Sequence, residues 1–250
     1  MKSKVDIPVN RFDAFIFDLD GVVTETAKIH AKAWKKTFDE YLEKRAGSEG
    51  EFEPFDIKTD YPRYVDGIPR YDGVKNFLES RGIHLPYGSS NDPPGKETVC
   101  GIGNKKNEFF QEFMNKENIF VYDSTIDLIN RLRQNNIQTG IISSSKNCAR
   151  VLEIVNIRHL FDTKIDGTDS VRLELNGKPE PDIFIAAARD MGVDPERAAV
   201  VEDAVLGVEA GRRGNFGLVI GVDRTDHAED LKKSGADVVV SDLSEIRIQV

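Results

Sequence analysis

The sequence predicts an α/β protein in which a doubly wound, parallel β-sheet carries helices on both faces and a second, helical domain is inserted into the chain. From residue 124 onward, helical stretches alternate with short apolar stretches, and some of these, such as 198–201 and 238–240, are continuous apolar runs. Strands buried on both faces of a parallel sheet have this pattern. Residues 28–118 lack the alternation. We therefore expect a Rossmann-like core with an inserted helical cap domain.

The elements of the core follow from this alternation. The first strand is expected at about 13–18, and a helix that includes 26–45 follows it. After residue 124 the expected order is helix 124–135, strand 138–142, helix 147–155, strand 163–166, helix 181–191, strand 198–201, helix 204–213, strand 217–222, helix 226–234 and strand 237–240.

The segment between these parts is expected to form the cap. Residues 46–72 and 84–99 are rich in loop-forming residues such as Gly, Pro and Asp, and predict long loops. Helices are expected at 72–81 and 104–116. We therefore divide the chain into a core, 1–27 with 119–250, and a cap, 28–118.

Composition limits the possible functions. The net charge of -9 argues against general nucleic-acid binding, which needs a basic surface. No window is apolar enough to cross a bilayer, and residues 1–11 lack the apolar centre of a signal peptide, so we expect a cytoplasmic protein without a membrane partner. Cys100 and Cys148 have no metal-ligand spacing and are expected to be ordinary buried or half-buried thiols. We expect a monomer.

Two aspartates directly after the first strand are the most informative residues. Asp18 and Asp20 stand two positions apart, so both carboxyl groups can face one small space beyond the strand, and Gly21 lets the backbone turn away. Two carboxylates that close together need a metal, a shared proton or a substrate to compensate them. The simpler alternative is a strand that ends in a solvated acidic turn.

Further polar groups follow other strands at the same expected edge. Residues 143–147, Ser-Ser-Ser-Lys-Asn, lead into a helix whose first backbone amides suit a phosphate. Glu202 and Asp203 follow strand 198–201, and Mg²⁺ would accept carboxylates from Asp203 and from the first strand. Lys178, in a Pro-rich turn, could neutralise a phosphoryl oxygen.

Each of these groups alone has a simpler interpretation as a helix cap or a solvated charge. Their common position, after parallel strands or in the next loop, favours a phosphoryl-transfer site.

These motifs resemble those of the haloacid dehalogenase superfamily. Residues 18–22, Asp-Leu-Asp-Gly-Val, are similar to its first motif, and Ser143, Lys178 and 202–203 are similar to its second, third and fourth. The order fits across nearly the whole chain, with the cap inserted between the first and second motifs. A closer resemblance, to the beta-phosphoglucomutase-like subgroup, is carried by 18–27 with His30 and 33–34, by 143–147 and by 178–184.

The resemblance implies a role for each core motif. Asp18 would be the nucleophile that forms an aspartyl phosphate, and Asp20 the general acid and base. Magnesium would be held by Asp18, Asp203, the main-chain carbonyl of Asp20 and Glu202. Ser143 and Lys178 would hold the phosphoryl oxygens, and the substrate would also meet Ser144, Ser145 and Asn147 of the same run.

The resemblance also implies substrate contacts in the cap. Arg70 follows a Gly-Ile-Pro sequence and would meet the phosphate that is not transferred, Lys106 would contact the sugar, and His30 would lie at the hinge. Surface charge and a structural histidine are the simpler alternatives. The loops 46–66 and 84–98 look longer than those of a minimal cap of this subgroup, and their tyrosines could reshape the sugar pocket: Tyr61, Tyr64 and Tyr87.

The leading hypothesis is a magnesium-dependent enzyme of carbohydrate metabolism that converts beta-glucose 1-phosphate to glucose 6-phosphate through a sugar bisphosphate. A sugar-phosphate phosphatase of the same superfamily, in which water discharges Asp18, is the alternative, and a non-catalytic sugar-phosphate sensor is less favoured. A nicotinamide dehydrogenase is disfavoured because the turn after the first strand lacks GxGxxG.

Overall fold

A computed structural model describes residues 4–47 and 51–249 of the chain. It forms two compact units, Met1–Glu25 with Phe120–Val250, which is the core, and Thr26–Ile119, which is the cap. The expected boundaries, after 27 and after 118, lie two residues and one residue away. Within the described residues no helix has a stretch long and apolar enough to span a bilayer.

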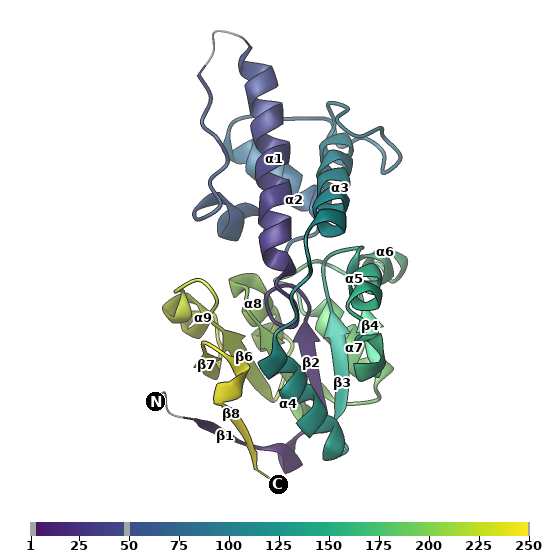
Figure 1. Ribbon diagram of the computed structural model, residues 1–250, viewed down its shortest axis with the longest axis vertical. Coiled ribbons are helices and arrows are strands. Elements are labelled where there is room, and N and C mark those ends of the chain that lie inside the picture. Colours follow the sequence, from purple (N-terminus) through teal and green to yellow (C-terminus); the bar gives the residue numbers. More distant parts are fainter. Residues whose placement is uncertain (1–3, 48–50, 250) are drawn as a thin grey trace. The chain divides into compact units, whose positions relative to one another are not determined.

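The core contains a six-stranded parallel sheet with the strand order β4-β3-β2-β5-β6-β7 (Figure 1). Numbered along the sheet-forming part of the chain, this is the order 3-2-1-4-5-6 of a Rossmann fold. The sequence-based prediction of the fold class is therefore confirmed. The strands are β2 (Ala14–Asp18), β3 (Gln138–Ile142), β4 (Thr163–Ile165), β5 (Ala198–Glu202), β6 (Leu218–Val222) and β7 (Val238–Val240).

Alternation along β2 explains how the sheet is buried on both sides. All five residues of this strand are buried. Ala14 and Ile16 join an apolar cluster with Phe184, Val208 and Leu231, while the intervening phenylalanines point to the opposite face. Helices α7 (Asp182–Asp190), α8 (Val205–Arg213) and α9 (Ala228–Lys233) supply one side of this packing, and α4 (Asp123–Gln134) packs on β3.

The remaining helices of the core are short. α5 (Cys148–Ile154) follows β3, and α6 (Gly167–Arg172) follows β4. The sequence-based prediction includes the first and misses the second. Asp166 begins α6 by accepting from the amides of Thr168 and Asp169, and the Asp169 side chain accepts from the Asp166 amide in return. This capping box stabilises a helix too short to show apolar periodicity.

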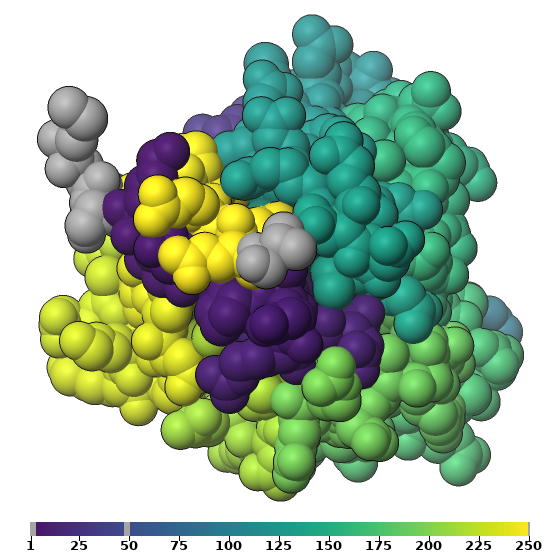
Figure 2. All heavy atoms as spheres, turned by 90° about the horizontal axis from the view of Figure 1, so that it is seen from below, coloured from purple at the N-terminus to yellow at the C-terminus, as the bar shows by residue number. Residues whose placement is uncertain are grey.

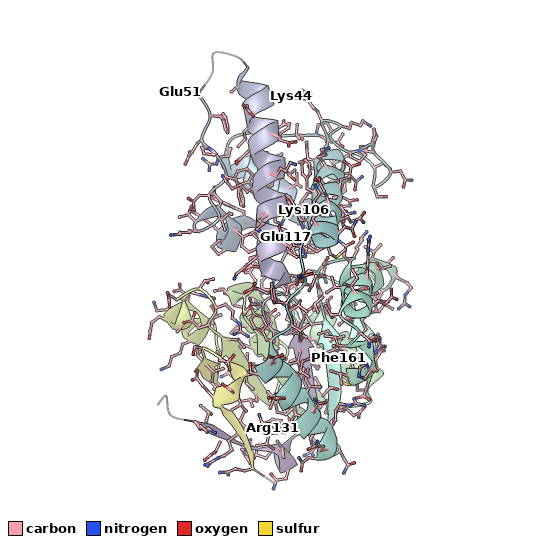
Figure 3. The ribbon with its side chains drawn as sticks, in the orientation of Figure 1. Lys44, Glu51, Lys106, Glu117, Arg131 and Phe161 are labelled. Carbon is pink, nitrogen blue, oxygen red and sulfur yellow. The ribbon has the colours of Figure 1, made fainter. Side chains whose placement is uncertain are left out.

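A second, two-stranded sheet joins sequence-distant ends of the core. β1 (Val5–Pro8) pairs in parallel with β8 (Ile246–Gln249), and Figure 2 shows the N-terminal and C-terminal segments side by side on this face. Arg131 of α4, labelled in Figure 3, donates to the Ile246 carbonyl at 3.4 Å. Neither strand is predicted from the sequence, because each has only four residues, too few for its apolar alternation to stand out.

The cap is built around an aromatic cluster. α1 (Thr26–Ala46) and α2 (Arg70–Ser80) contribute Phe38 and Phe77, whose ring centroids lie 4.1 Å apart. Phe55, from the segment between these helices, is fully buried against both rings. The long loop is therefore anchored by an apolar side chain, and a π-helix at Tyr61–Val65 follows. Deleting a ring of this size from a core typically costs about 3–5 kcal/mol.

The third cap helix, α3 (Val99–Lys116), begins five residues before the expected start at 104. Thr98 caps it by accepting from the Gly101 amide at 2.9 Å. Glycines 101 and 103 make this stretch look unlike a helix, but a Cβ on Gly103 would lie 2.7 Å from the Tyr71 ring. Close packing against α2 thus outweighs the low helix propensity of glycine.

The loop before α3 is ordered around Asp92. Its carboxylate accepts from the Thr98 hydroxyl at 2.7 Å, the Lys96 ammonium at 2.6 Å and the Ser89 amide at 3.1 Å. The side chain of Asn104 donates to the Asp92 carbonyl at 2.8 Å. This expected long loop is therefore a compact, hydrogen-bonded segment.

We predict that Asp92 makes the stability of the cap sensitive to acid. Its bonds to Lys96, Thr98 and the Ser89 amide lower the pKa of the Asp92 carboxyl from 3.8 to about 2. Because the folded-state pKa is the lower one, this stabilisation is present above pH 3.8 and is lost as the pH falls through about 2. Thermal unfolding of the Asp92→Asn variant across this range should lack that component. The control is Asp123→Asn, at an exposed position of the core unit, and this variant should keep the acid-sensitive component. Equal acid sensitivity of Asp92→Asn and the wild type would contradict the prediction.

Candidate active site

The aspartate pair lies at the carboxyl end of β2, where the strand order of the sheet reverses between β2 and β5. Asp18 is 5% exposed, and its Oδ2 accepts from the Asp20 amide at 2.8 Å. The turn closes with a 2.7 Å hydrogen bond from the Gly21 amide to the Thr24 carbonyl, and Gly21 has φ +90°. This crevice is where ligands bind in doubly wound folds.

Lys178 connects the ends of β2 and β5. Its buried ammonium donates to Asp18 Oδ1 at 2.6 Å and to Glu202 Oε1. The other oxygen of Glu202 accepts from the Ala204 amide at 2.8 Å. One cation is thus buried between two carboxylates that come from neighbouring strands.

This arrangement leaves negative charge uncompensated. Burial raises the pKa of the Asp18 carboxyl well above its usual range; the Lys178 ammonium opposes the shift, and the negative charges of Glu202 and Asp20 add to it. Burial by itself would lower the pKa of Lys178, but Asp18 and Glu202 outweigh burial and raise it, so Lys178 stays protonated. A further positive charge at this site would favour the ionised, nucleophilic form of Asp18.

Ser143 is fully buried at the end of β3, and it contacts the second aspartate. Its hydroxyl donates to Asp20 Oδ2 at 2.9 Å and accepts from the Ser145 amide at 3.0 Å. The Ser145 hydroxyl in turn accepts from the Asn147 amide at 3.2 Å. The run 143–147 is therefore a tight turn that lies directly beside the aspartates, with Ser144 partly exposed.

Asp203 reaches the same place from the end of β5. A Cβ on Gly21 would lie 1.8 Å from Asp203 Oδ2, so the Asp203 carboxylate rests against the bare Cα of the first turn. Glycine at position 21 is thus required both for its positive φ and for this close approach. The two acidic turns are in direct contact.

The donors present fit a magnesium ion. Asp18 and Asp203 offer oxygen ligands in a region of excess negative charge, which suits a hard divalent cation. Among the described residues no three His, Cys, Asp or Glu side chains gather as a metal-binding group. Two carboxylates and a main-chain carbonyl, completed by water and substrate, agree with the habit of Mg²⁺ to retain several non-protein ligands.

Glu202 has a different role in this geometry from the one expected. Both carboxylate oxygens accept from protein donors, Lys178 and the Ala204 amide. A Cβ on Gly207 would lie 1.9 Å from Glu202 Oε1, so α8 encloses the carboxylate closely. Glu202 as a metal ligand stays a prediction that these contacts do not favour; they make it the partner of Lys178.

The predicted cap residues form contacts within the cap. Lys106, labelled in Figure 3, is 3% exposed, and its Nζ lies 2.5 Å from His30 Nδ1 and 4.8 Å from the Trp34 ring centroid. Arg70 donates to the Asn107 side chain at 2.8 Å, and burial lowers the pKa of its guanidinium. These interactions fix the direction of the cationic side chains.

The three loop tyrosines also lie in the cap. Tyr61 packs against the aromatic cluster of the cap, and the Tyr64 ring lies 6.0 Å from that of Phe77. Tyr87 is 55% exposed and meets the Tyr71 ring edge-on at 6.2 Å. A change of the sugar pocket by these residues stays a prediction.

Sequence reasoning missed two residues that contact the acidic turns. Arg224 donates to the Gly21 carbonyl at 2.9 Å, and His227 Nε2 lies 2.9 Å from the Asp203 carbonyl. Both residues follow the end of β6 at the same edge of the sheet. Their position after a strand was the available signal, but neither belongs to a recognisable motif.

Comparison with known proteins decides the family. The family model described as "haloacid dehalogenase-like hydrolase" matches residues 12–215. The chain belongs to this family. Its sequence is 44% identical over 237 residues to a beta-phosphoglucomutase of Mycobacterium tuberculosis, which covers 93% of this chain and 90% of the relative. The expectations of an enzyme and of this family, with its beta-phosphoglucomutase-like subgroup, are thereby confirmed.

Solved structures and partial relatives agree with this family. The crystal structure of beta-phosphoglucomutase from Clostridium difficile matches with a TM-score of 0.72 and 28% identity, covering 94% of this chain and 93% of that one. A trehalose-phosphate phosphatase of Mycobacterium leprae is 36% identical over 131 residues, which is 51% of this chain and 29% of that protein. Phosphatases are thus also among the relatives.

We predict that Gly21→Ala impairs the site more than it impairs folding. Gly21 and Gly192 both have positive φ, so an alanine at either costs about 1–2 kcal/mol in backbone strain. Only at Gly21 does the new methyl group meet Asp203; at Gly192 nothing lies within 4 Å. Chemical denaturation should show similar stability losses for the two variants. Turnover of a sugar phosphate should fall on the order of 10- to 100-fold further in Gly21→Ala, and equal turnover would contradict the contact.

Proposed function

We propose that this protein is a magnesium-dependent beta-phosphoglucomutase, which converts beta-glucose 1-phosphate to glucose 6-phosphate through a sugar bisphosphate. The observation that carries the proposal is the 44% identity, over 93% of the chain, to a mycobacterial enzyme of that name. The contacts of Asp18, Asp20 and Lys178 at one strand edge support it. The substrate would be a small sugar phosphate.

Asp18 supplies the nucleophile in this proposal. In the phosphorylated enzyme, a carboxylate oxygen of Asp18 carries the phosphoryl group, and the sugar hydroxyl attacks the phosphorus as the bond to Asp18 breaks. The bisphosphate then turns, Asp18 takes the phosphoryl group from carbon 1, and glucose 6-phosphate leaves. The short contact with Lys178 fixes the carboxylate and places positive charge beside the transferring oxygens.

Asp20 moves the proton. It removes the proton from the attacking sugar hydroxyl, and it returns a proton to the leaving oxygen in the second half of the cycle. Its Oδ2 accepts from the buried Ser143 hydroxyl, which orients the carboxyl group. Asp18 is instead held by an ammonium and an amide, so the two carboxyl groups have different surroundings and can differ in protonation.

Magnesium would be held by Asp18, Asp203 and the Asp20 carbonyl, and it would supply charge neutralisation for the phosphoryl oxygens. Ser143, Ser144, Ser145 and Asn147 would bind those oxygens through hydroxyls, the side-chain amide and backbone amides. In the cap, Arg70 would bind the second phosphate bidentately, and Lys106 with His30 would contact the sugar.

A sugar-phosphate phosphatase is the second candidate, because half of the chain is similar to a trehalose-phosphate phosphatase. In that case water replaces the sugar hydroxyl at phosphorylated Asp18. The same residues serve both reactions, so the acceptor decides between them.

The first test measures both products. Purified protein with Mg²⁺, beta-glucose 1-phosphate and a trace of the bisphosphate should form glucose 6-phosphate with little inorganic phosphate. Release of inorganic phosphate without formation of glucose 6-phosphate would contradict the mutase proposal and support the phosphatase. Isomerisation coupled to a glucose 6-phosphate dehydrogenase and a phosphate assay in parallel measure the two outcomes.

We predict that Asp18→Asn lowers kcat by at least about 10⁴-fold, because the amide cannot form the phosphoryl-enzyme. Asp13→Asn is the matched control, since Asp13 directly precedes the same strand but pairs with Arg197 on the surface. The control should keep wild-type turnover in the coupled assay. Unchanged turnover in Asp18→Asn would show that another residue is the nucleophile.

For Asp20→Asn we expect a smaller loss in kcat, about 10²- to 10⁴-fold, since the nucleophile remains and only proton transfer is removed. Quenched-flow detection of the aspartyl phosphate should show that the phosphoryl-enzyme still forms with an activated donor such as acetyl phosphate. A variant that turns over normally would exclude Asp20 as the acid and base.

A further inference from the structure

The segment 223–227 connects β6 to α9 and lies at the edge of the sheet that carries the acidic turns. It is fixed by its own hydrogen bonds and by β7. The Asp223 amide donates to the Val240 carbonyl at 2.7 Å, and the Asp223 carboxylate accepts from the His227 amide at 2.9 Å. A loop held in this way can position whatever its side chains contact.

Arg224 binds the backbone of the first acidic turn. Its Nε donates to the Gly21 carbonyl at 2.9 Å, and Nη1 donates to the Ser241 carbonyl at 3.3 Å. The guanidinium lies 3.7 Å from the centroid of the Tyr122 ring. The side chain is 15% exposed, so three separate segments enclose the guanidinium. Because the planar group is held on three sides, its Nε has one direction, toward Gly21.

One donor of Arg224 is left unsatisfied. Nη2 is buried and has no hydrogen-bond acceptor among the residues that the structure describes. Such a group typically costs about 1–3 kcal/mol. An apolar side chain packed on Tyr122 would avoid this cost, so packing alone does not account for an arginine here. Its polar contacts do: Nη1 reaches the Ser241 carbonyl and lies 3.6 Å from the Asp242 carboxylate, and Nε alone binds the acidic turn at Gly21.

His227 binds the backbone of the second acidic turn. Its Nε2 lies 2.9 Å from the Asp203 carbonyl, which can only accept, so Nε2 carries the hydrogen and donates it. Nδ1 lies 2.8 Å from the Thr225 hydroxyl, which can donate to it. The ring orientation is therefore fixed from both sides.

We propose that Arg224 and His227 are positioning residues that set the separation between the Gly21 turn and the Asp203 carboxylate, and thereby the geometry of the magnesium site. Gly21 and the Asp203 carboxylate are in close contact, since a Cβ at residue 21 would lie 1.8 Å from Asp203 Oδ2. A small change in their separation would therefore move the carboxylate relative to the first turn. One short loop binds the backbone on both sides of this contact. The inference rests on the proposed magnesium-dependent function, but its test uses no sugar phosphate.

The test compares variants that remove the donors with variants that keep one. Arg224→Leu and His227→Leu remove them, while Arg224→Lys and His227→Gln retain an N–H that can reach a carbonyl. Matched controls are Arg212→Leu, whose side chain is 58% exposed and pairs with Asp237, and His159→Leu at an exposed site. Two properties are measured well below the unfolding temperature: amide hydrogen exchange at 19–24 and 203–205 without metal, and the affinity for Mg²⁺ alone by calorimetry.

Removal of either donor should accelerate exchange in both acidic turns and weaken Mg²⁺ binding on the order of 10-fold, as for other residues that orient metal ligands. The controls should match the wild type, and His227→Gln should recover most of the loss. Arg224→Lys should recover less, because an ammonium lacks the planar group that also reaches Ser241.

Wild-type exchange and wild-type Mg²⁺ affinity in the leucine variants would overturn the proposal. If the leucine variants do not fold, Arg224→Lys and His227→Gln provide the test. Weaker Mg²⁺ binding and faster amide exchange in Arg224→Lys than in His227→Gln support the proposal. Wild-type binding and wild-type exchange in both of these variants contradict it. A protein that lacks mutase activity still gives both measurements, so failure of the proposed function is distinguished from failure of this inference.

Discussion

The buried ammonium of Lys178 between Asp18 and Glu202 is the interaction on which the site depends. Three charged groups from separate segments are removed from water, and each would be strongly destabilising without the others. Because each charge requires the others as partners, the end of β2, the end of β5 and the Lys178 turn are held together. The charges do not cancel, because one cation faces two carboxylates and Asp20 lies nearby. A site of this kind favours a divalent cation, whose charge would also offset that of a bound phosphoryl group.

Small residues make the close approach of these groups possible. Gly21 lets the Asp203 carboxylate rest on the first turn, and Gly207 lets α8 enclose Glu202. Around them, hydrogen bonds to backbone carbonyls, from Arg224 and His227, hold the turns from outside. In the proposed function the chemistry is carried by a few carboxylates, and we infer that glycines and outer donors determine where those carboxylates lie. Rigid support of this type is what precise positioning of reactive groups requires.

The core fold and its motifs could be predicted because β2 and β5 are almost entirely apolar and fully buried, and the acidic motifs stand at their ends. The same reasoning fails where tertiary contacts decide. Glycines 101 and 103 conceal the start of α3, since their role is to let the Tyr71 ring and the Lys96 backbone approach. β1 and β8 are too short for a reliable prediction, and each forms a strand only because it pairs with the other. Glu202 was recognisable as an acidic residue, but its pairing with Lys178 depends on a contact between distant segments.

The strand order has a consequence for synthesis. Asp18 is synthesised 160 residues before its counterion Lys178, and Glu202 follows another 24 residues after that. A growing chain therefore holds the end of β2 as an exposed acidic turn until β5 emerges and pairs with it. The site cannot mature gradually along the ribosome; it assembles in one late step, when the second half of the sheet closes on the first. Chains interrupted just before that point would contain Asp18, Asp20, Ser143 and Lys178, but they would lack Glu202 and Asp203 and the strand that holds them beside the first turn.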